Sequence, residues 1–156
     1  SAKPRGSSSG RGDVTPESLY SQLAAKLKVP ALRPDAQGRV TLDFVDGPPI
    51  VLAIPARGQL YAEAELERLP ARPSDTEALM RRLLGRSLGT LRERPEVLAL
   101  DSAGQRLILY RRFDIDTLSF ADFEADFTEF LDQVELWKAT SAPARPIGPA
   151  SLMIFP

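Results

Sequence analysis

Residues 40–66, VTLDFVDGPPIVLAIPARGQLYAEAEL, decide the fold, because they contain three strand patterns in immediate succession. Apolar and polar side chains alternate over Val40–Val45 and again over Leu60–Glu67, whereas Ile50–Ile54 is apolar throughout. Alternation predicts a strand with one buried face, and a wholly apolar run predicts a strand covered on both faces. Turn signals separate the three strands, at Asp46-Gly47-Pro48-Pro49 and at Arg57-Gly58.

A helix is predicted before this run. Thr15-Pro16-Glu17 suits a helix N-terminus, because Thr can cap, Pro fits the first turn and Glu faces the positive end of the dipole. Leu19, Leu23 and Leu27 then repeat every four residues as one apolar stripe. Val29-Pro30 ends the pattern.

After the run, Ser74-Asp75-Thr76-Glu77 reads as a capping box that opens a second helix. Two further strands are predicted at Val97–Asp101 and Gln105–Phe113. Ser119 with Asp122 then caps a last helix, in which aromatic residues recur at steps of three and four up to Trp137. The order α-β-β-β-α-β-β-α predicts the α+β class, an antiparallel sheet packed with helices.

The 156 residues are enough for one ordinary domain. We predict a flexible arm over residues 1–14, a folded domain over 15–139, and a Pro-rich tail over 140–156 that ends in the apolar run Leu152–Phe155. The 20 basic and 21 acidic side chains give a net charge of −1. The chain therefore lacks the excess of basic residues typical of proteins that bind nucleic acid or anionic membranes.

The chain contains no Cys and no His, which excludes Ser-His-Asp and Cys-His catalysis within one chain and Cys zinc sites. No phosphate-binding Gly motif is present, and paired acids such as Glu63 and Glu65 read as a solvated strand face. We therefore expect no catalytic residue, no metal and no cofactor.

Three surface features each have more than one interpretation. Val45, Val51, Ala53, Tyr61, Ile108 and Tyr110 fall opposite the predicted core face, where an apolar patch would mark a partner site, or be covered by the tail or a second subunit. Gly85 and Gly89 lie on the face of the second helix opposite its leucine residues. Small residues there would allow the same helix of a second subunit to approach closely; alternatively, the glycines mark where the helix frays. Eight acids and no Lys or Arg lie between Phe113 and Trp137, which is a solvated face or a surface for a basic segment.

Four stretches, together with the order of elements, resemble the class I type III secretion chaperones, the Tir chaperone family. They are VTLDF at 40–44 followed by PIVL at 49–52, LLGRSL at 83–88, VLALDSAGQRLIL at 97–109, and Phe130-Leu131 with Trp137. The likeness spans about residues 16–139. The chain departs from the family in having Ser87 where Asn is common, and in its Pro-rich tail.

The resemblance implies a non-enzymatic cytoplasmic homodimer in a Gram-negative bacterium, with a role in virulence. Such a chaperone binds the N-terminal segment of a secreted effector in extended form and supports its delivery to the secretion ATPase. Carried onto this chain, the effector-facing candidates are Leu19, Leu23, Val51, Ala53, Ile108 and Tyr110. The dimer candidates are Leu84, Gly85, Leu88 and Gly89.

Two other classes compete with this hypothesis. A small α+β regulatory or ligand-sensing domain would bind a metabolite in a closed apolar cavity. A hydrolase that uses carboxylates alone would need two acids with different protonation in one cleft, and the sequence offers no such pair.

Overall fold

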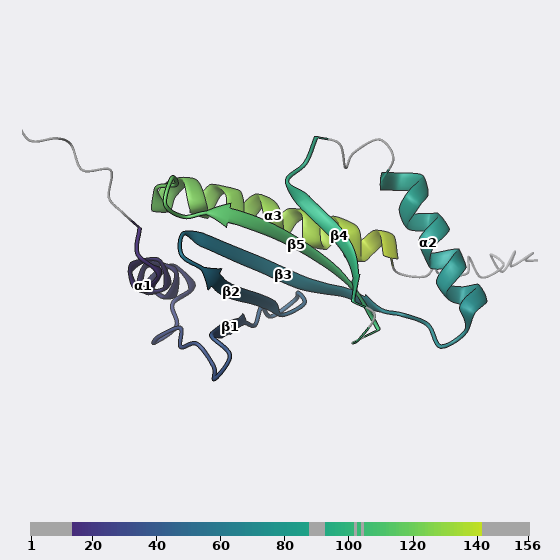
Figure 1. Ribbon diagram of the computed structural model, residues 1–156, viewed down its shortest axis with the longest axis horizontal. Coiled ribbons are helices and arrows are strands. Elements are labelled where there is room, and N and C mark those ends of the chain that lie inside the picture. The colour runs from purple at the N-terminus through teal and green to yellow at the C-terminus, as the bar shows by residue number, and fades with distance from the viewer. Residues whose placement is uncertain (1–13, 88–92, 102, 104, 142–156) are drawn as a thin grey trace, which may run out of the picture.

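The computed structural model describes residues 14–87, 93–101, 103 and 105–141 (Figure 1). Its elements, in chain order, are α1 (Pro16–Leu27), β1 (Arg39–Leu42), β2 (Ile50–Ala56), β3 (Gln59–Arg68), α2 (Pro73–Ser87), β4 (Glu96–Asp101), β5 (Arg106–Asp114) and α3 (Phe120–Ser141). The predicted order of elements and the α+β class are both confirmed.

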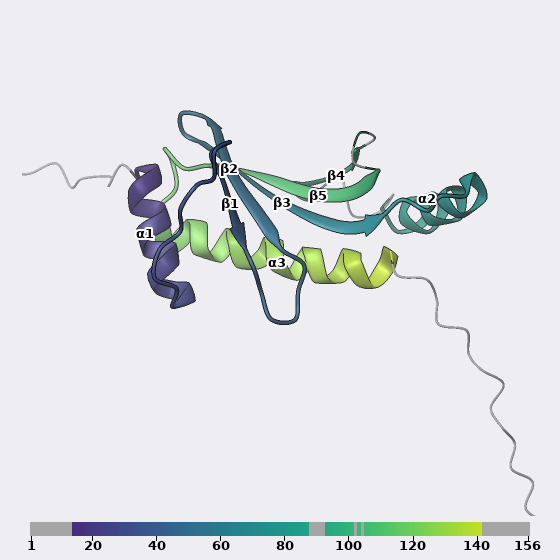
Figure 2. The same cartoon turned by 90° about the horizontal axis from the view of Figure 1, so that it is seen from below.

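The five strands form one sheet in the order β1-β2-β3-β5-β4, and every neighbouring pair is antiparallel. Figure 2 shows α3 running along one face of this sheet, with α1 near the N-terminal end of α3 and α2 beyond the opposite end. The opposite face of the sheet, here called the outer face, carries none of the three helices. Strands β1 and β4 are the two edges.

The core lies between the sheet and α3. One face of β3 contributes Leu60, Ala62, Ala64 and Leu66, each at most 2% exposed, which confirms the predicted alternation. Phe123, Phe127, Phe130, Val134 and Trp137 of α3 are buried against the sheet. Because Ala62 and Ala64 have small side chains at the centre of the sheet, the bulky aromatic residues of α3 fit above them.

Local capping explains where the helices begin. The Thr15 hydroxyl accepts a hydrogen bond from the Ser18 N–H at the start of α1, and the Ser119 hydroxyl accepts one from the Asp122 N–H at the start of α3, as predicted. The capping box at Ser74 is not formed, because α2 begins one residue earlier, at Pro73. Proline suits the first turn of a helix, where its missing N–H needs no partner.

The first strand is shorter than predicted, which places Val45 in a loop. Leu42 pairs with Ile50, so Asp43 and Phe44 would have to pair with the two prolines that precede Ile50. Proline has no N–H to donate to a strand ladder, so pairing ends at Leu42. Val45 therefore lies fully exposed in the β1–β2 loop, and the prediction that it belongs to the outer face of the sheet is wrong.

Candidate functional site

Three neighbouring, mainly apolar hollows follow α1, the edge strand β1 and the β1–β2 loop. A first hollow of about 770 Å³ lies between α1 and the loop that follows it, and a second of about 450 Å³ lies between that loop and β1. A third, of about 260 Å³, lies between the β1–β2 loop and α3. The first two share Val29, Ala31 and Leu32, and the last two share Phe44 and Val45. We call these three hollows together the β1-edge groove.

The backbone beside this groove has a free hydrogen-bonding edge at Thr41. Arg39 directs its N–H to the Asp35 carboxylate, at 2.9 Å, and its C=O accepts from the Asp35 N–H, at 2.8 Å. Both Arg39 groups thus point away from β2. Because successive residues of a strand direct these groups to opposite sides, the N–H and C=O of Thr41 also point away from β2. Within the described residues they have no backbone partner.

Asp35 shapes the wall of the groove between α1 and β1. Its carboxylate accepts hydrogen bonds from the N–H groups of Arg39 and Gln37, at 2.9 and 2.8 Å. These two bonds, the Arg39 bond foremost, hold the pKa of Asp35 below its ordinary value, because they stabilise the charged form. The turn they close places Gly38 at φ +74°, in the left-handed region that favours glycine.

Tyr20 lines the first hollow from α1. Its side chain is 8% exposed, and its hydroxyl has no hydrogen-bond partner among the described residues. Burial raises the pKa of this hydroxyl, because removal from water disfavours the phenolate. Most residues that line the first hollow are apolar, and Glu17 and Ser21 are its polar members besides Tyr20.

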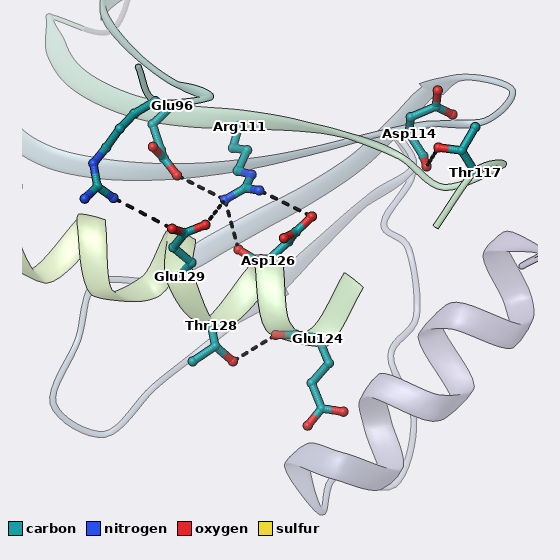
Figure 3. Close-up of polar contacts among 9 residues, drawn as sticks. Glu96, Arg111, Asp114, Thr117, Glu124, Asp126, Thr128 and Glu129 are labelled. Carbon is teal, nitrogen blue, oxygen red and sulfur yellow. Dashed lines mark hydrogen bonds and ion pairs between the residues drawn. The ribbon is translucent and has the colours of Figure 1, made fainter. Parts of the chain in front are cut away.

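A buried charge cluster joins the other edge strand, β4, to α3 (Figure 3). The Arg111 Nη1 group donates to Glu96 Oε1 at 3.1 Å and to Glu129 Oε2 at 3.2 Å, and Nη2 lies 3.3 Å from Asp126 Oδ2. Glu96 and Arg111 are only 3% and 6% exposed. Glu96 begins β4, whereas Asp126 and Glu129 belong to α3, so one guanidinium connects both elements.

A second exposed apolar surface lies on α2 and β4. Leu84 of α2 is 53% exposed, and Val97 and Leu100 of β4 are 42% and 46% exposed. Gly85, next to Leu84, is exposed, and a Cβ added to it would meet no other atom within 4 Å. We call these four residues the α2–β4 surface; Val97 and Leu100, three residues apart in the strand, lie on opposite faces of β4. The molecule thus has an apolar surface at each edge of its sheet.

Metal-ligand clusters and membrane-spanning helices are both absent from the part of the chain that the structure describes. No group of three or more potential metal ligands gathers among residues 14–87, 93–101, 103 and 105–141. None of the helices described there is long and apolar enough to span a membrane.

The model of the Tir chaperone protein (CesT) family matches residues 18–138, which is most of the chain. The chain belongs to the Tir chaperone family. A comparison with curated proteins finds no match.

Solved structures agree with this assignment at the level of the fold. A chain of the ExsC–ExsE complex superposes with a TM-score of 0.65 at 23% identity, covering 81% of this chain and 93% of that one. A chain of the HopA1–SchA chaperone–effector complex gives 0.62 at 18% identity, covering 83% and 98%. The ExoU–SpcU complex of the Pseudomonas aeruginosa type III secretion system gives 0.55 at 17% identity, covering 81% and 97%.

Within this Tir chaperone fold, the six predicted effector-facing residues fall into two groups. Leu19 and Leu23 are 0% and 3% exposed and belong to the hydrophobic core. Their four-residue spacing places them on the face of α1 that packs inward, so a partner at α1 would have to touch its exposed residues instead. These two side chains are therefore better explained as core than as contacts.

The other four, Val51, Ala53, Ile108 and Tyr110, lie half-buried on the outer face of the sheet. This face is less apolar than expected, because charged residues separate them. Arg106 pairs there with Asp101 at 2.6 Å, Glu65 at 3.5 Å and Glu63 at 3.8 Å. Tyr110 also packs against Tyr61, with ring centroids 6.3 Å apart. A partner strand on this face would meet paired charges as well as apolar groups.

Of the predicted dimer residues, Leu84 and Gly85 are exposed on α2, whereas Leu88 and Gly89 lie outside the described residues. The role of all four in dimerisation stays a prediction.

Sequence reasoning missed the residues that build the β1-edge groove and the buried cluster. Val29 is a single apolar residue before Pro30 that no periodic pattern marks, whereas the alternation over Val40–Val45 assigns Val45 to the outer face of the sheet instead of to the groove. The cluster did leave a signal. Arg111 lies two residues from both Leu109 and Phe113, so its side chain is on the same face of β5 as theirs. Glu96 likewise shares a face of β4 with Leu98. Each therefore places a charge on an otherwise apolar face.

Proposed function

We propose that this Tir chaperone family member is a non-enzymatic cytoplasmic type III secretion chaperone that holds the N-terminal segment of a secreted effector in extended form. The observation that carries the proposal is the β1-edge groove, an apolar track beside a strand edge with free backbone groups. Membership of the family supports the class of function.

An extended segment suits this groove physically. Its alternate side chains would enter the hollows, and burial of apolar surface contributes roughly 25 cal/mol per Å² before the cost of ordering the segment. Its backbone would pair with the N–H and C=O of Thr41, each hydrogen bond contributing about 0.5–1.5 kcal/mol. A segment without a core of its own gains this burial only in the extended state, so binding would keep it unfolded.

The groove is tested with a tagged chain expressed in its native bacterium. We expect one polypeptide to co-purify, and to be bound through a segment near its N-terminus that the chaperone protects from protease. Replacement of two groove valines, Val29→Asp with Val45→Asp, is expected to weaken that complex about tenfold or more, because it places carboxylates against apolar contacts. Isothermal titration with the purified partner segment measures the affinity.

The matched control is Leu136→Asp with Ala139→Asp, which adds the same charge to exposed positions of α3 outside the groove. This variant is expected to bind like the wild type. Equal affinities of the groove variant and the control would contradict the groove assignment, while the co-purified partner would still report on the chaperone function.

The proposal includes a homodimer through the α2–β4 surface. Leu84 lies next to Gly85 on α2, where a second backbone could approach closely, and Val97 and Leu100 add exposed apolar side chains on the edge strand β4. Delivery to the secretion ATPase is also part of the proposal, and the family membership is its support.

Gly85→Leu is expected to separate the two protomers while leaving each folded. The new side chain has room within one protomer and removes a glycine from a helix, so the helix itself gains about 0.8–1 kcal/mol of propensity. Light scattering should show the mass of one chain in place of two, with unchanged circular dichroism. Ala121→Leu, which adds the same bulk to an exposed position of α3, should leave the mass unchanged. A Gly85→Leu protein that keeps twice the chain mass would argue against this interface.

A further inference from the structure

The third hollow of the β1-edge groove differs from the other two in its charge. It lies where the β1–β2 loop passes α3, and Figure 2 shows that loop reaching beyond the helix. Its apolar lining includes Phe44, Val45 and Leu131, and its acidic lining consists of Asp46 from the loop and Glu135 from α3. Two elements far apart in sequence therefore each contribute an acid to one apolar hollow.

These acids have no partner within the part of the chain that the structure describes. Asp46 and Glu135 make no ion pair or hydrogen bond with the described residues, and neither do their neighbours Asp43 and Asp132. In contrast, three other acids of α3 form ion pairs: Glu124 pairs with Lys26, and Asp126 and Glu129 pair with Arg111.

Among the described residues, no Lys or Arg lines the hollow. The β1–β2 loop contains no Lys or Arg, and neither does the chain from Asp114 to Trp137. Lys138 follows Glu135 by one helical turn and is exposed, yet it forms no ion pair with it. An occupant of the hollow would therefore meet uncompensated negative charge on two sides.

The size and lining of the hollow define what fits. About 260 Å³ is below the roughly 300–1,000 Å³ of a typical small-molecule site, and it suits one apolar side chain. Val45 is fully exposed at the rim among the described residues, so an apolar group of a bound segment that covers it would gain burial. The hollow is therefore complementary to an apolar side chain, the anchor, with a positive charge beside it.

We infer that the segment held in the β1-edge groove carries a Lys or Arg next to the apolar residue that fills the hollow between Val45 and Leu131. This inference rests on the proposed function and specifies the chemistry of its partner. The anchor displaces water from Phe44, Val45 and Leu131, and the neighbouring basic side chain lies between Asp46 and Glu135. Charge complementarity then selects this segment among apolar ones and speeds its encounter.

Three fluorescein-labelled peptides test the inference. Each has about nine residues, roughly 30 Å when extended, with the same alternating Leu and Val residues. The residues between them are Lys and Ser, Gln and Ser, or Glu and Ser. Fluorescence anisotropy at about 50 mM NaCl is expected to show the Lys peptide binding about fivefold more tightly than the Gln peptide, and the Glu peptide more weakly still. At about 300 mM NaCl the differences should shrink, because these charges are exposed.

Variants locate the effect. Asp46→Asn with Glu135→Gln should remove most of the preference for the Lys peptide while keeping the affinity for the Gln peptide. Asp75→Asn with Asp116→Asn removes the same charge from exposed positions outside the groove and should keep the preference.

The outcomes separate this inference from the proposed function. If the Gln peptide binds and the Lys peptide shows no advantage, or the advantage survives in the Asp46/Glu135 variant, the inference is wrong and the groove assignment stands. If none of the peptides binds, the groove assignment is wrong and the inference falls with it.

Discussion

Replacement of Phe123 by alanine is expected to lower the free energy of unfolding by about 3–5 kcal/mol, which is a large share of the 5–15 kcal/mol typical of a folded domain. Phe123 is 1% exposed, in the first turn of α3. Its ring meets Phe113 edge-on at 5.1 Å and stacks with Phe127 at 5.6 Å. Removing the ring leaves a cavity between β5 and α3, which neither rigid element can close.

Urea denaturation followed by circular dichroism measures this loss. The control is Phe120→Ala, because Phe120 begins the same helix and is only partly buried. Its ring centroid lies 6.3 Å from that of Phe123. Its expected loss is about 1–2 kcal/mol, since less apolar surface returns to water. Equal losses at the two positions would show that Phe123 is not the core residue that its burial indicates.

Arg111→Met is expected to lower the free energy of unfolding by a similar amount, about 3–5 kcal/mol, for an electrostatic reason. Arg111 binds Glu96, whose side chain is 2% exposed, and it also binds Asp126 and Glu129, whose side chains are 37% and 53% exposed. Without the guanidinium, the two α3 acids can turn to water, whereas Glu96 stays buried. The penalty therefore concentrates on Glu96, where a charge would remain in a nonpolar environment without a partner.

A second substitution separates this effect from lost packing. Arg111→Met with Glu96→Gln should regain about 1–3 kcal/mol of the loss measured by urea denaturation, because the unpaired buried charge is gone. Arg81→Met serves as control, since Arg81 forms an exposed ion pair with Glu77 and should cost only about 0.3–0.5 kcal/mol. A double variant no more stable than Arg111→Met would mean that the buried charge of Glu96 is not the source of the cost.

This cluster has a bearing on function. It holds Glu96, the first residue of β4, against α3, and β4 carries Val97 and Leu100 of the α2–β4 surface. In the proposed homodimer, an edge strand must keep its position to present those side chains. The buried ion pairs thus connect the stability of the protomer to the surface by which two protomers would meet.

The amino-acid sequence by itself determined the elements, their order and most of their inward faces. The prediction that Ile50–Ile54 is covered on both faces is wrong, because no helix lies on the outer face and Val51 and Ala53 are only half-buried. Period-two alternation over Leu60–Glu67 and steps of three and four along the last helix each predict which side chains turn inward, and both are confirmed. These features depend on neighbours within about one turn or one strand, so a local pattern records them. The resemblance to the Tir chaperone family rests on the same local patterns, and it is confirmed as well.

Tertiary structure alone decided which apolar residues remain available to a partner. Leu19 and Leu23 read as surface contacts but are buried, because α1 packs against residues far away in sequence. Val29 carries no periodic signal, and the alternation over Val40–Val45 assigns Val45 to the sheet, yet both line one hollow beside β1, because the loop after α1 runs next to the end of that strand. Exposure is set by the elements that cover a residue, and those elements come from distant parts of the chain, so no local pattern encodes it.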